Sequence, residues 1–410
     1  MARRLLIDES PFGMRAMLTV DDAPVQLVHH FAMRCEPRVG QIFWARAGAR
    51  DERLGGQVFE LGQAGEGLMP VKDRVHPEGA MVMVGIRREP IDAKKALLTD
   101  RPFVRLPCVS FTSDGMGRPG PLGSQPAPDQ LLQAVRSPPP KRAGVLAGIP
   151  DMPRLIALIA DAPIDGLVCS SGDLAAAVQR FIPQELPVEI DDAIDRFFLA
   201  GEEAAVSRTE PLPGGGRLVF DQAEALTAID LDIGNRAARS GQGAAAAALR
   251  AALKTLGRGL TLRAIGGQVV LDLPRQAVKA PKMLRDQLTA ALKGTGLSSI
   301  PAVTKEGLVI MLLRQQRRPL IDDLTEERGG GPDLVRPARR LREDIAAWRA
   351  YSEASALLRG DRSGRYALTL PQELAAEWTR TRAEKNLNRT FGHRLSVSAE
   401  RVERWRFEPL

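Results

Sequence analysis

The sequence predicts a multidomain protein of mixed α+β and α/β class. Three observations lead to this prediction. A chain of 410 residues is too long for one ordinary core and favours about two to four domains. Short strand patterns separated by glycine and proline run through residues 3–105. Strand and helix patterns alternate from residue 151 onward, which is typical of sheets covered by helices.

Residues 3–33 are predicted to form three short strands. Turn residues separate the apolar runs, which is typical of a β-meander. The predicted strands are Arg3–Ile7, Met14–Val20 and Pro24–Phe31.

Residues 37–105 favour a small Greek-key barrel of the OB type, because short strands recur there at close spacing. Such barrels often bind single-stranded nucleic acid on one face, and a purely structural barrel is equally compatible with the pattern. The five predicted strands are Gly40–Arg46, Gln57–Leu61, Gly67–Val71, Met81–Arg87 and Ala96–Thr99.

Two polar stretches are predicted to be linkers. Residues 112–142 are rich in Gly, Pro and Ser, and residues 314–342 carry Arg317-Arg318 and a glycine triplet. Between them, the predicted elements are helices Asp151–Ala162, Gly172–Phe181 (with Ser170 or Ser171 as N-cap) and Asp191–Ala205, and a strand Gly166–Cys169. Residues 343–410 are predicted to form a small α/β domain.

Residues 214–293 are predicted to form a sheet with helices on both faces. Strand patterns alternate here with helical patterns. The predicted elements are strands Arg217–Phe220, Leu226–Leu231 and Gln268–Leu271, and helices Gly243–Leu256 and Lys282–Lys293.

Composition indicates a soluble, basic chain. Hydrophobic residues make up 44%, and the net charge of +7 favours a polyanionic partner. No run approaches the roughly 18 apolar residues of a membrane helix, and Asp8 and Glu9 interrupt any leader-like segment. We therefore expect a cytoplasmic protein without a membrane segment. Cys35, Cys108 and Cys169 lie far apart, so buried free thiols are expected rather than a zinc site.

Three aspartates are candidate metal-binding residues. Asp230 and Asp232 lie two apart on a predicted strand and so share one face of it. Asp272 ends an apolar strand, where open α/β sheets place ligands. Carboxylates gathered there repel one another unless a cation offsets the charge, and Mg²⁺ is typically held by one or two carboxylates plus waters. Spacing alone is not specific, and it favours aspartates that are solvated or that cap helices.

Two longer motifs give a resemblance to a known family. Residues 215–232 read Gly-Gly-Arg-Leu-Val-Phe-Asp-Gln-Ala-Glu-Ala-Leu-Thr-Ala-Ile-Asp-Leu-Asp, and residues 262–272 read Leu-Arg-Ala-Ile-Gly-Gly-Gln-Val-Val-Leu-Asp. Both resemble signatures of the ribonuclease E/G family. The resemblance implies hydrolysis of single-stranded RNA, with Mg²⁺ held by Asp230 and Asp272 and assisted by Asp232. Weaker similarity extends over nearly the whole chain.

The resemblance also implies a domain order. It gives an RNase H-like part at 1–36 and 181–213, split around an S1-like OB barrel at 37–108 and a linker with a 5′-sensor-like region at 109–180. A DNase I-like catalytic subdomain follows at 214–315, then a linker at 316–342 and a small C-terminal α/β domain at 343–410.

Four departures from the family pattern concern metal and RNA binding. Arg314–Gly331 lacks the cysteines of a zinc link, although a homodimer stays compatible with the sequence. Cys169 replaces the sensor arginine beside Ser170, which removes a bidentate phosphate donor. Val58 and Leu68 replace barrel aromatics that would stack on bases. The acidic residue that often follows the second catalytic aspartate is absent from Leu273-Pro274-Arg275.

RNA-binding candidates remain at the family's barrel lysine, Lys94, and at Ser170, Arg275 and Lys279, with Arg236 as a further phosphate contact. Phe43 and Phe59 of the barrel are expected in its core. The sequence thus predicts an Mg²⁺-dependent endoribonuclease. A non-catalytic RNA-binding or ribosome-associated protein of the same fold is the main alternative, and a DNA nuclease or other phosphodiesterase is a third.

Overall fold

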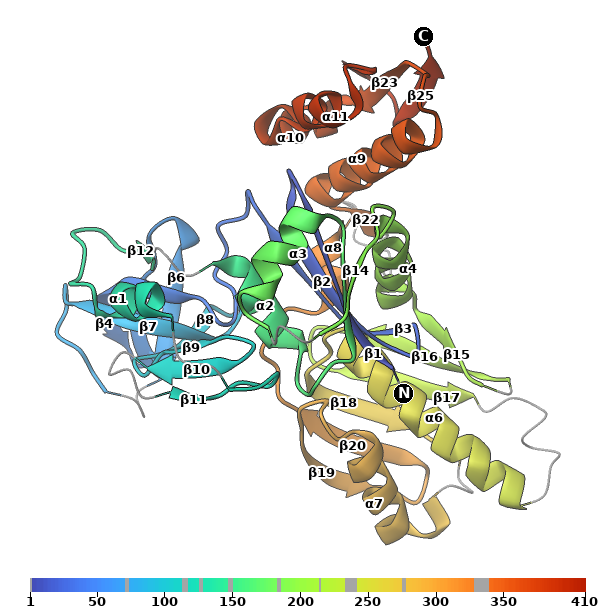
Figure 1. Cartoon of the computed structure of the whole chain (residues 1–410). Helices are drawn as coiled ribbons and strands as arrows, with labels where there is room; N and C mark the ends of the chain where they lie inside the picture. The colour runs from blue at the N-terminus through green and yellow to red at the C-terminus, as the bar shows by residue number, and fades with distance from the viewer. Residues whose placement is uncertain are drawn as a thin grey trace.

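The computed structural model shows a mixed α+β chain with several sheets (Figure 1). It describes residues 2–70, 74–112, 117–124, 128–146, 150–182, 186–213, 215–232, 242–274, 278–327 and 339–410, without the side chains of 242–248. Among these residues, no helix combines the length and the apolar character needed to cross a membrane.

The first sheet has the strand order β14-β13-β1-β2-β3. β1 (Arg3–Ser10), β2 (Gly13–Val20) and β3 (Ala23–Phe31) are antiparallel, whereas β13 (Gly166–Cys169) and β14 (Val188–Ile190) add in parallel. The predicted domain boundary at residue 181 therefore falls within this folded unit, because β13 precedes it and β14 follows it.

Both faces of the first sheet are covered because its strands are apolar on both sides. Leu5 and Ile7 of β1 pack with α2 (Asp151–Ile159) and α3 (Gly172–Gln179). Leu6 points the other way and packs in a cluster with α4 (Asp195–Val206) and the C-terminal helix α9 (Glu343–Gly360). Ser171 caps α3, as predicted, by accepting a hydrogen bond from the Leu174 N–H at 3.2 Å.

A closed five-stranded barrel follows, which confirms the barrel predicted from the strand spacing. The order β4-β5-β6-β8-β7 closes through β4–β7 pairing, and the short β12 (Gly144–Val145) extends it. The strands are β4 (Ile42–Asp51), β5 (Gly56–Glu60), β6 (Glu66–Pro70), β7 (Met81–Arg88) and β8 (Ala96–Thr99), with a 3-10 turn, η1 (Gly62–Ala64).

Residues 103–136 contain folded elements where a linker was predicted for 112–142. β9 (Phe103–Arg105), β10 (Val109–Thr112) and β11 (Gly117–Pro119) form a small sheet, and α1 (Asp129–Arg136) packs beside it. Leu131 and Val135 lie one helical turn apart and are buried. Their i, i+4 spacing is the signal that the Gly/Pro-rich composition concealed.

The third sheet has the order β15-β16-β17-β18-β20-β19. Its core packs against α6 (Gln242–Leu262) and α7 (Pro281–Ala291). The strands are β15 (Thr209–Pro211), β16 (Arg217–Gln222), β17 (Thr227–Asp232), β18 (Gly267–Asp272), β20 (Leu308–Leu313) and β19 (Leu297–Val303).

Within the part of the chain that the structure describes, helices cover one face of this third sheet, whereas two covered faces were predicted. Leu308 and Leu312 of β20 are 39% and 40% exposed on the other face. β15–β16–β17 and β18–β20–β19 are antiparallel runs, and α6 and α7 are the helices between these strands within the described residues. The described residues therefore supply no second helical layer over this face.

The C-terminal part begins with α8 (Leu320–Leu324), β21 (Thr325–Glu327) and β22 (Arg339–Leu341), and α9 then leads into a small α/β region that shares a core with the first sheet. Its sheet has the order β24-β23-β25. Its elements are β23 (Tyr366–Pro371), α10 (Gln372–Thr381), α11 (Ala383–Phe391), β24 (Leu395–Glu400) and β25 (Arg406–Pro409).

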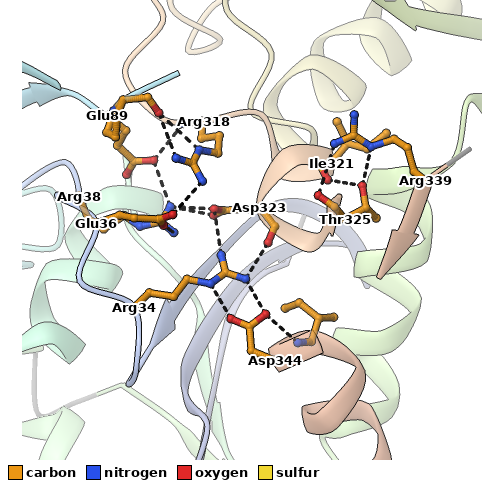
Figure 2. Close-up of polar contacts among 12 residues, drawn as sticks. Arg34, Glu36, Arg38, Glu89, Arg318, Ile321, Asp323, Thr325, Arg339 and Asp344 are labelled. Atoms are coloured by element: carbon orange, nitrogen blue, oxygen red, sulfur yellow. Dashed lines mark hydrogen bonds and ion pairs between the residues drawn. The ribbon is translucent and has the colours of Figure 1, made fainter. Parts of the chain in front are cut away.

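A buried charged junction joins the barrel to the segment that leaves the third sheet (Figure 2). Arg38, which precedes the barrel, donates to Asp323 of α8 and to Glu89, which follows β7. Arg34 donates to Asp344 of α9 at 2.6 and 2.8 Å. The stretch 314–342 was predicted to be a linker. Its described residues instead contact the barrel through Arg318 and Asp323.

Candidate active site

The candidate site lies on the open face of the third sheet. Along β17 the side chains alternate, because successive residues of a strand point to opposite faces. Ile229 and Leu231 are buried against the helices, whereas Asp230 and Asp232 are exposed. In β18, Val269 and Leu271 are buried and Asp272 is exposed.

Asp230 and Asp272 are direct partners in the register of two adjacent parallel strands. Neighbouring strands lie about 4.7–4.9 Å apart, and register partners in a parallel pair point to the same face. Both carboxylates therefore stand side by side where β17 and β18 end. No ion pair of either side chain is found within the described ranges, so no arginine there fills the space between them.

The neighbours of the pair come from the flanking strands. Val219 of β16 is the register partner of Asp230, and Leu308 of β20 is that of Asp272. The open face is thus apolar on both sides of the two acids, whereas Asp232 faces Arg217 across the β16–β17 ladder. Sequence reasoning did not single out Arg217, although the alternation of β16 would have placed it on this face.

Gly307 shapes the space beside Asp272. Its φ of +119° is a conformation that favours glycine. A Cβ at this position would lie 2.3 Å from the Leu273 carbonyl oxygen and 3.5 Å from Asp272 Oδ1. A side chain here would therefore displace the backbone next to the carboxylate. This requirement was also absent from the sequence-based prediction.

The residues present fit a magnesium ion held by two carboxylates. Mg²⁺ is usually bound through one or two carboxylates and keeps several waters. Asp230 and Asp272 supply such a pair, exposed and adjacent. A group of three or more His, Cys, Asp or Glu side chains that could hold a metal is not found in the described part of the chain. Asp232 is therefore considered apart from the two candidate ligands.

The predicted RNA-binding residues lie in separate places. Lys94 is exposed in the loop between β7 and β8, and Lys279 is exposed just before α7. Ser170 directly follows β13 of the first sheet and lines a cleft there, away from the third sheet. Arg275 and Arg236 lie outside the described residues.

Two aliphatic side chains of the barrel, Val58 and Leu68, stand where the resembling family has aromatic residues. Val58 and Leu68 are register partners on β5 and β6, and both are half-buried. They form one aliphatic patch where paired aromatic rings would stack on bases. Phe43 and Phe59 are 2% and 0% exposed and belong to the barrel core, as predicted.

The three cysteines differ from the prediction in one position. Cys108 and Cys169 are buried, as expected, but Cys35 is exposed in the segment between β3 and the barrel. Burial raises the pKa of the Cys169 thiol to about 12, so the thiol stays neutral. Cys169 therefore presents no charge at the position where the resembling family has a sensor arginine.

These features define a mixed α+β protein in which a closed barrel accompanies a helix-backed sheet with paired carboxylates on its open face. Residues 186–317, which contain this whole sheet, match the model of the Ribonuclease E/G family. This region of the chain is thus similar to that family, in agreement with the resemblance seen in the two motifs. The similarity points to a ribonuclease-related function.

A curated relative supports the same assignment. The chain is 30% identical over 130 residues to a "Ribonuclease E/G-like protein, chloroplastic" from Arabidopsis thaliana. The match covers 30% of this chain and 13% of the relative. The similarity therefore concerns one region of a much longer protein.

Proposed function

We propose that this protein is an Mg²⁺-dependent endoribonuclease that hydrolyses single-stranded RNA. One observation carries the proposal: Asp230 and Asp272 are register partners at the ends of two parallel strands, on an open face. The family region spans both residues. An open face suits a polymeric substrate, because a chain can cross it without threading through an enclosed pocket.

The carboxylates of Asp230 and Asp272 would hold the ion, with waters completing its coordination. When bound, Mg²⁺ stabilises charge on a phosphodiester and activates water. Asp232, two residues beyond Asp230 on the same face, would assist or orient the attacking water. Val219 and Leu308 flank the pair and give the substrate an apolar surface on either side.

A cleavage assay tests the proposal. Purified protein is incubated with an internally labelled AU-rich RNA in Mg²⁺, and wild type is compared with Asp230→Asn and Asp272→Asn. A DNA of the same sequence serves as the second substrate. We expect each variant to lose at least a hundredfold in rate, and the DNA to stay intact. Equal cleavage by all three proteins would assign the activity to a contaminant.

A non-catalytic RNA-binding role is the alternative. The aliphatic patch of Val58 and Leu68 and the buried, neutral Cys169 favour it, because both remove groups that would grip RNA. A salt titration without Mg²⁺ separates the two functions, since phosphate-driven affinity falls steeply with salt. Salt-sensitive binding with no cleavage under any Mg²⁺ concentration would select this alternative.

A further inference from the structure

A cavity of about 450 Å³ lies between the first sheet and the helices that back the third sheet. One wall comes from β1, β2 and β3, and the other comes from α6 and the end of α7. The volume falls in the range of roughly 300–1,000 Å³ that is typical of small-molecule sites, which occur preferentially between domains. Neither Asp230 nor Asp272 lines this cavity, so it is separate from the candidate metal site.

The crossing of α6 and α7 places two lysines at the cavity. A Cβ at Gly257 would lie 2.7 Å from the Ala291 carbonyl oxygen, so glycine lets α6 pack closely against the end of α7. Lys254 lies about one helical turn before Gly257, and Lys293 lies two residues after Ala291. Both lysines line the cavity and are exposed. Their positive charges therefore come together from two different helices.

These two lysines are in excess over the carboxylates of the cavity. Arg3 is neutralised by Asp161 at 2.6 Å, and Arg258 is neutralised by Glu210, which lies outside the cavity, at 2.6 Å. The other carboxylate of the lining is Asp21, which accepts a backbone N–H at 2.8 Å. Among the described residues, neither lysine has an ion-pair partner. Two free ammonium groups against one carboxylate favour an anionic ligand.

An amide without a partner lines the same cavity. Gln26 of β3 is only 9% exposed, and its side chain makes no hydrogen bond within the part of the chain that the structure describes. Buried polar side chains are normally hydrogen-bonded, because an unsatisfied group is costly. The amide of Gln26 offers two N–H donors and one carbonyl acceptor. These groups are therefore available to a ligand inside the cavity.

Apolar side chains make up much of the remaining wall. Leu18, Val20 and Val25 come from the first sheet, and Ala251 and Ala291 come from the two helices. Small-molecule sites are typically lined by apolar side chains with a few polar groups that fix the orientation of the ligand. The cavity thus suits a ligand with an apolar body, a hydrogen-bonding edge and an anionic group.

We propose that this cavity binds a free nucleoside monophosphate, with its base hydrogen-bonded to Gln26 and its phosphate held by Lys254 and Lys293. The edge of a nucleobase carries both donors and acceptors, which an amide side chain can match. Lysine binds phosphate as a point charge, and the apolar wall covers the faces of the base. The proposal does not depend on cleavage of RNA, because the cavity lies apart from the two aspartates.

Isothermal titration calorimetry of the full-length chain in EDTA tests the proposal. The probes are AMP, GMP, CMP and UMP, each compared with its nucleoside and with inorganic phosphate. We expect at least one monophosphate to bind with a dissociation constant below about 1 mM. Its nucleoside and inorganic phosphate should each bind at least about tenfold more weakly, because each lacks one of the two charge-assisted or hydrogen-bonded groups. Absence of binding by all four monophosphates would overturn the proposal.

A matched pair of variants tests the position of the phosphate. Lys254→Gln combined with Lys293→Gln should weaken binding of the monophosphate at least about tenfold, since hydrogen bonds to charged groups are the stronger ones. The control combines Lys141→Gln with Lys282→Gln, two exposed lysines that do not line the cavity. It makes the same change in charge and should leave the affinity nearly unaltered. Equal losses in both double variants would refute a phosphate site at this cavity.

Gln26→Leu tests the contact with the base. It should weaken binding of the monophosphate while the melting temperature of the free protein stays the same or rises, because the variant removes a buried amide that has no partner. Unchanged affinity would exclude Gln26 as a ligand contact. A 12-mer RNA that displaces the monophosphate would assign the cavity to an RNA strand and contradict a site for the free nucleotide. No readout uses catalysis, so failure of the cleavage assay and failure of this site are distinguishable.

Discussion

Arg38 and Asp323 lie 285 residues apart in the chain and meet in a buried ion pair, with Arg38 Nη1 at 2.9 and 3.0 Å from the two carboxylate oxygens (Figure 2). Glu89 and Glu36 also accept from Arg38, at 3.3 and 3.2 Å. The pair therefore ties the segment before the barrel, and the loop between β7 and β8, to the segment that leaves the third sheet.

Removing one member of this junction should destabilise the protein strongly. Arg38→Met removes the guanidinium that the buried Asp323 and Glu89 carboxylates share, and breaking a buried ion pair typically costs about 3–5 kcal/mol. Thermal unfolding followed by circular dichroism would measure the shift. Arg340→Met, which breaks the exposed pair with Glu326, is the control and should change stability little. Similar shifts for both variants would contradict a structural role of the junction.

Stability should fall in acid through Glu202. Burial, the largest influence, favours the neutral carboxyl, but a hydrogen bond with His29 and the charges of His29, Arg15 and Arg349 outweigh it and lower the pKa of Glu202 to about 2. A depressed pKa stabilises the fold above the unfolded value of 4.5, and this contribution is lost as pH falls from 4.5 toward 2.

Melting temperatures of wild type and Glu202→Gln between pH 2 and 7 would test this. Wild type should be the more stable protein at neutral pH, and the difference should narrow below pH 4.5. A difference that stays constant across the range would show that Glu202 does not titrate as proposed.

Two substitutions of Asp232 should show whether its side chain orients the attacking water or accepts a proton from it. An amide can still orient a water through hydrogen bonds, so Asp232→Asn should retain cleavage within about fivefold, whereas Asp232→Leu should lose more. A general base contributes typically about 10²–10⁴-fold. Single-turnover rates would decide, and a loss of that size in Asp232→Asn would assign Asp232 as the base instead.

The barrel patch should accept aromatic residues with a gain in affinity. Val58 and Leu68 are adjacent on the barrel surface, and stacking on an aromatic ring is worth about 1–3 kcal/mol per base. Leu68→Phe should therefore tighten binding of a single-stranded RNA at least fivefold by anisotropy. Leu54→Phe, at the exposed β4–β5 turn, is the control. An equal gain in both would indicate nonspecific hydrophobic binding.

The strand pattern around Asp230 could be predicted from sequence, because alternation of Ile229, Asp230 and Leu231 fixes which side chains point outward. The apolar run before Asp272 likewise predicted a strand that ends at the acid. The register between them could not be predicted. It depends on α6 returning the chain so that β18 lies parallel to β17, and on how far β18 slides along its neighbour.

The charged junction escaped prediction for a related reason. Arg317 and Arg318 look like solvated linker residues in sequence, yet Arg317 donates to the Leu27 carbonyl oxygen at 3.1 Å, and the backbone N–H of Arg318 donates to Glu89. Their partners lie more than 200 residues away in the chain. Local composition carries no information about such pairing. In the sequence, polar residues that long-range contacts bury therefore look the same as solvent-exposed residues.

The most direct test of the central claim is a metal titration of the protein without RNA. Mn²⁺, a paramagnetic substitute for Mg²⁺, is titrated into wild type, Asp230→Asn and Asp272→Asn, and free Mn²⁺ is measured by electron paramagnetic resonance. We predict one site in wild type whose affinity falls at least tenfold in each single variant, because both carboxylates hold the same ion. Equal Mn²⁺ binding by all three proteins would contradict a shared metal site at Asp230 and Asp272.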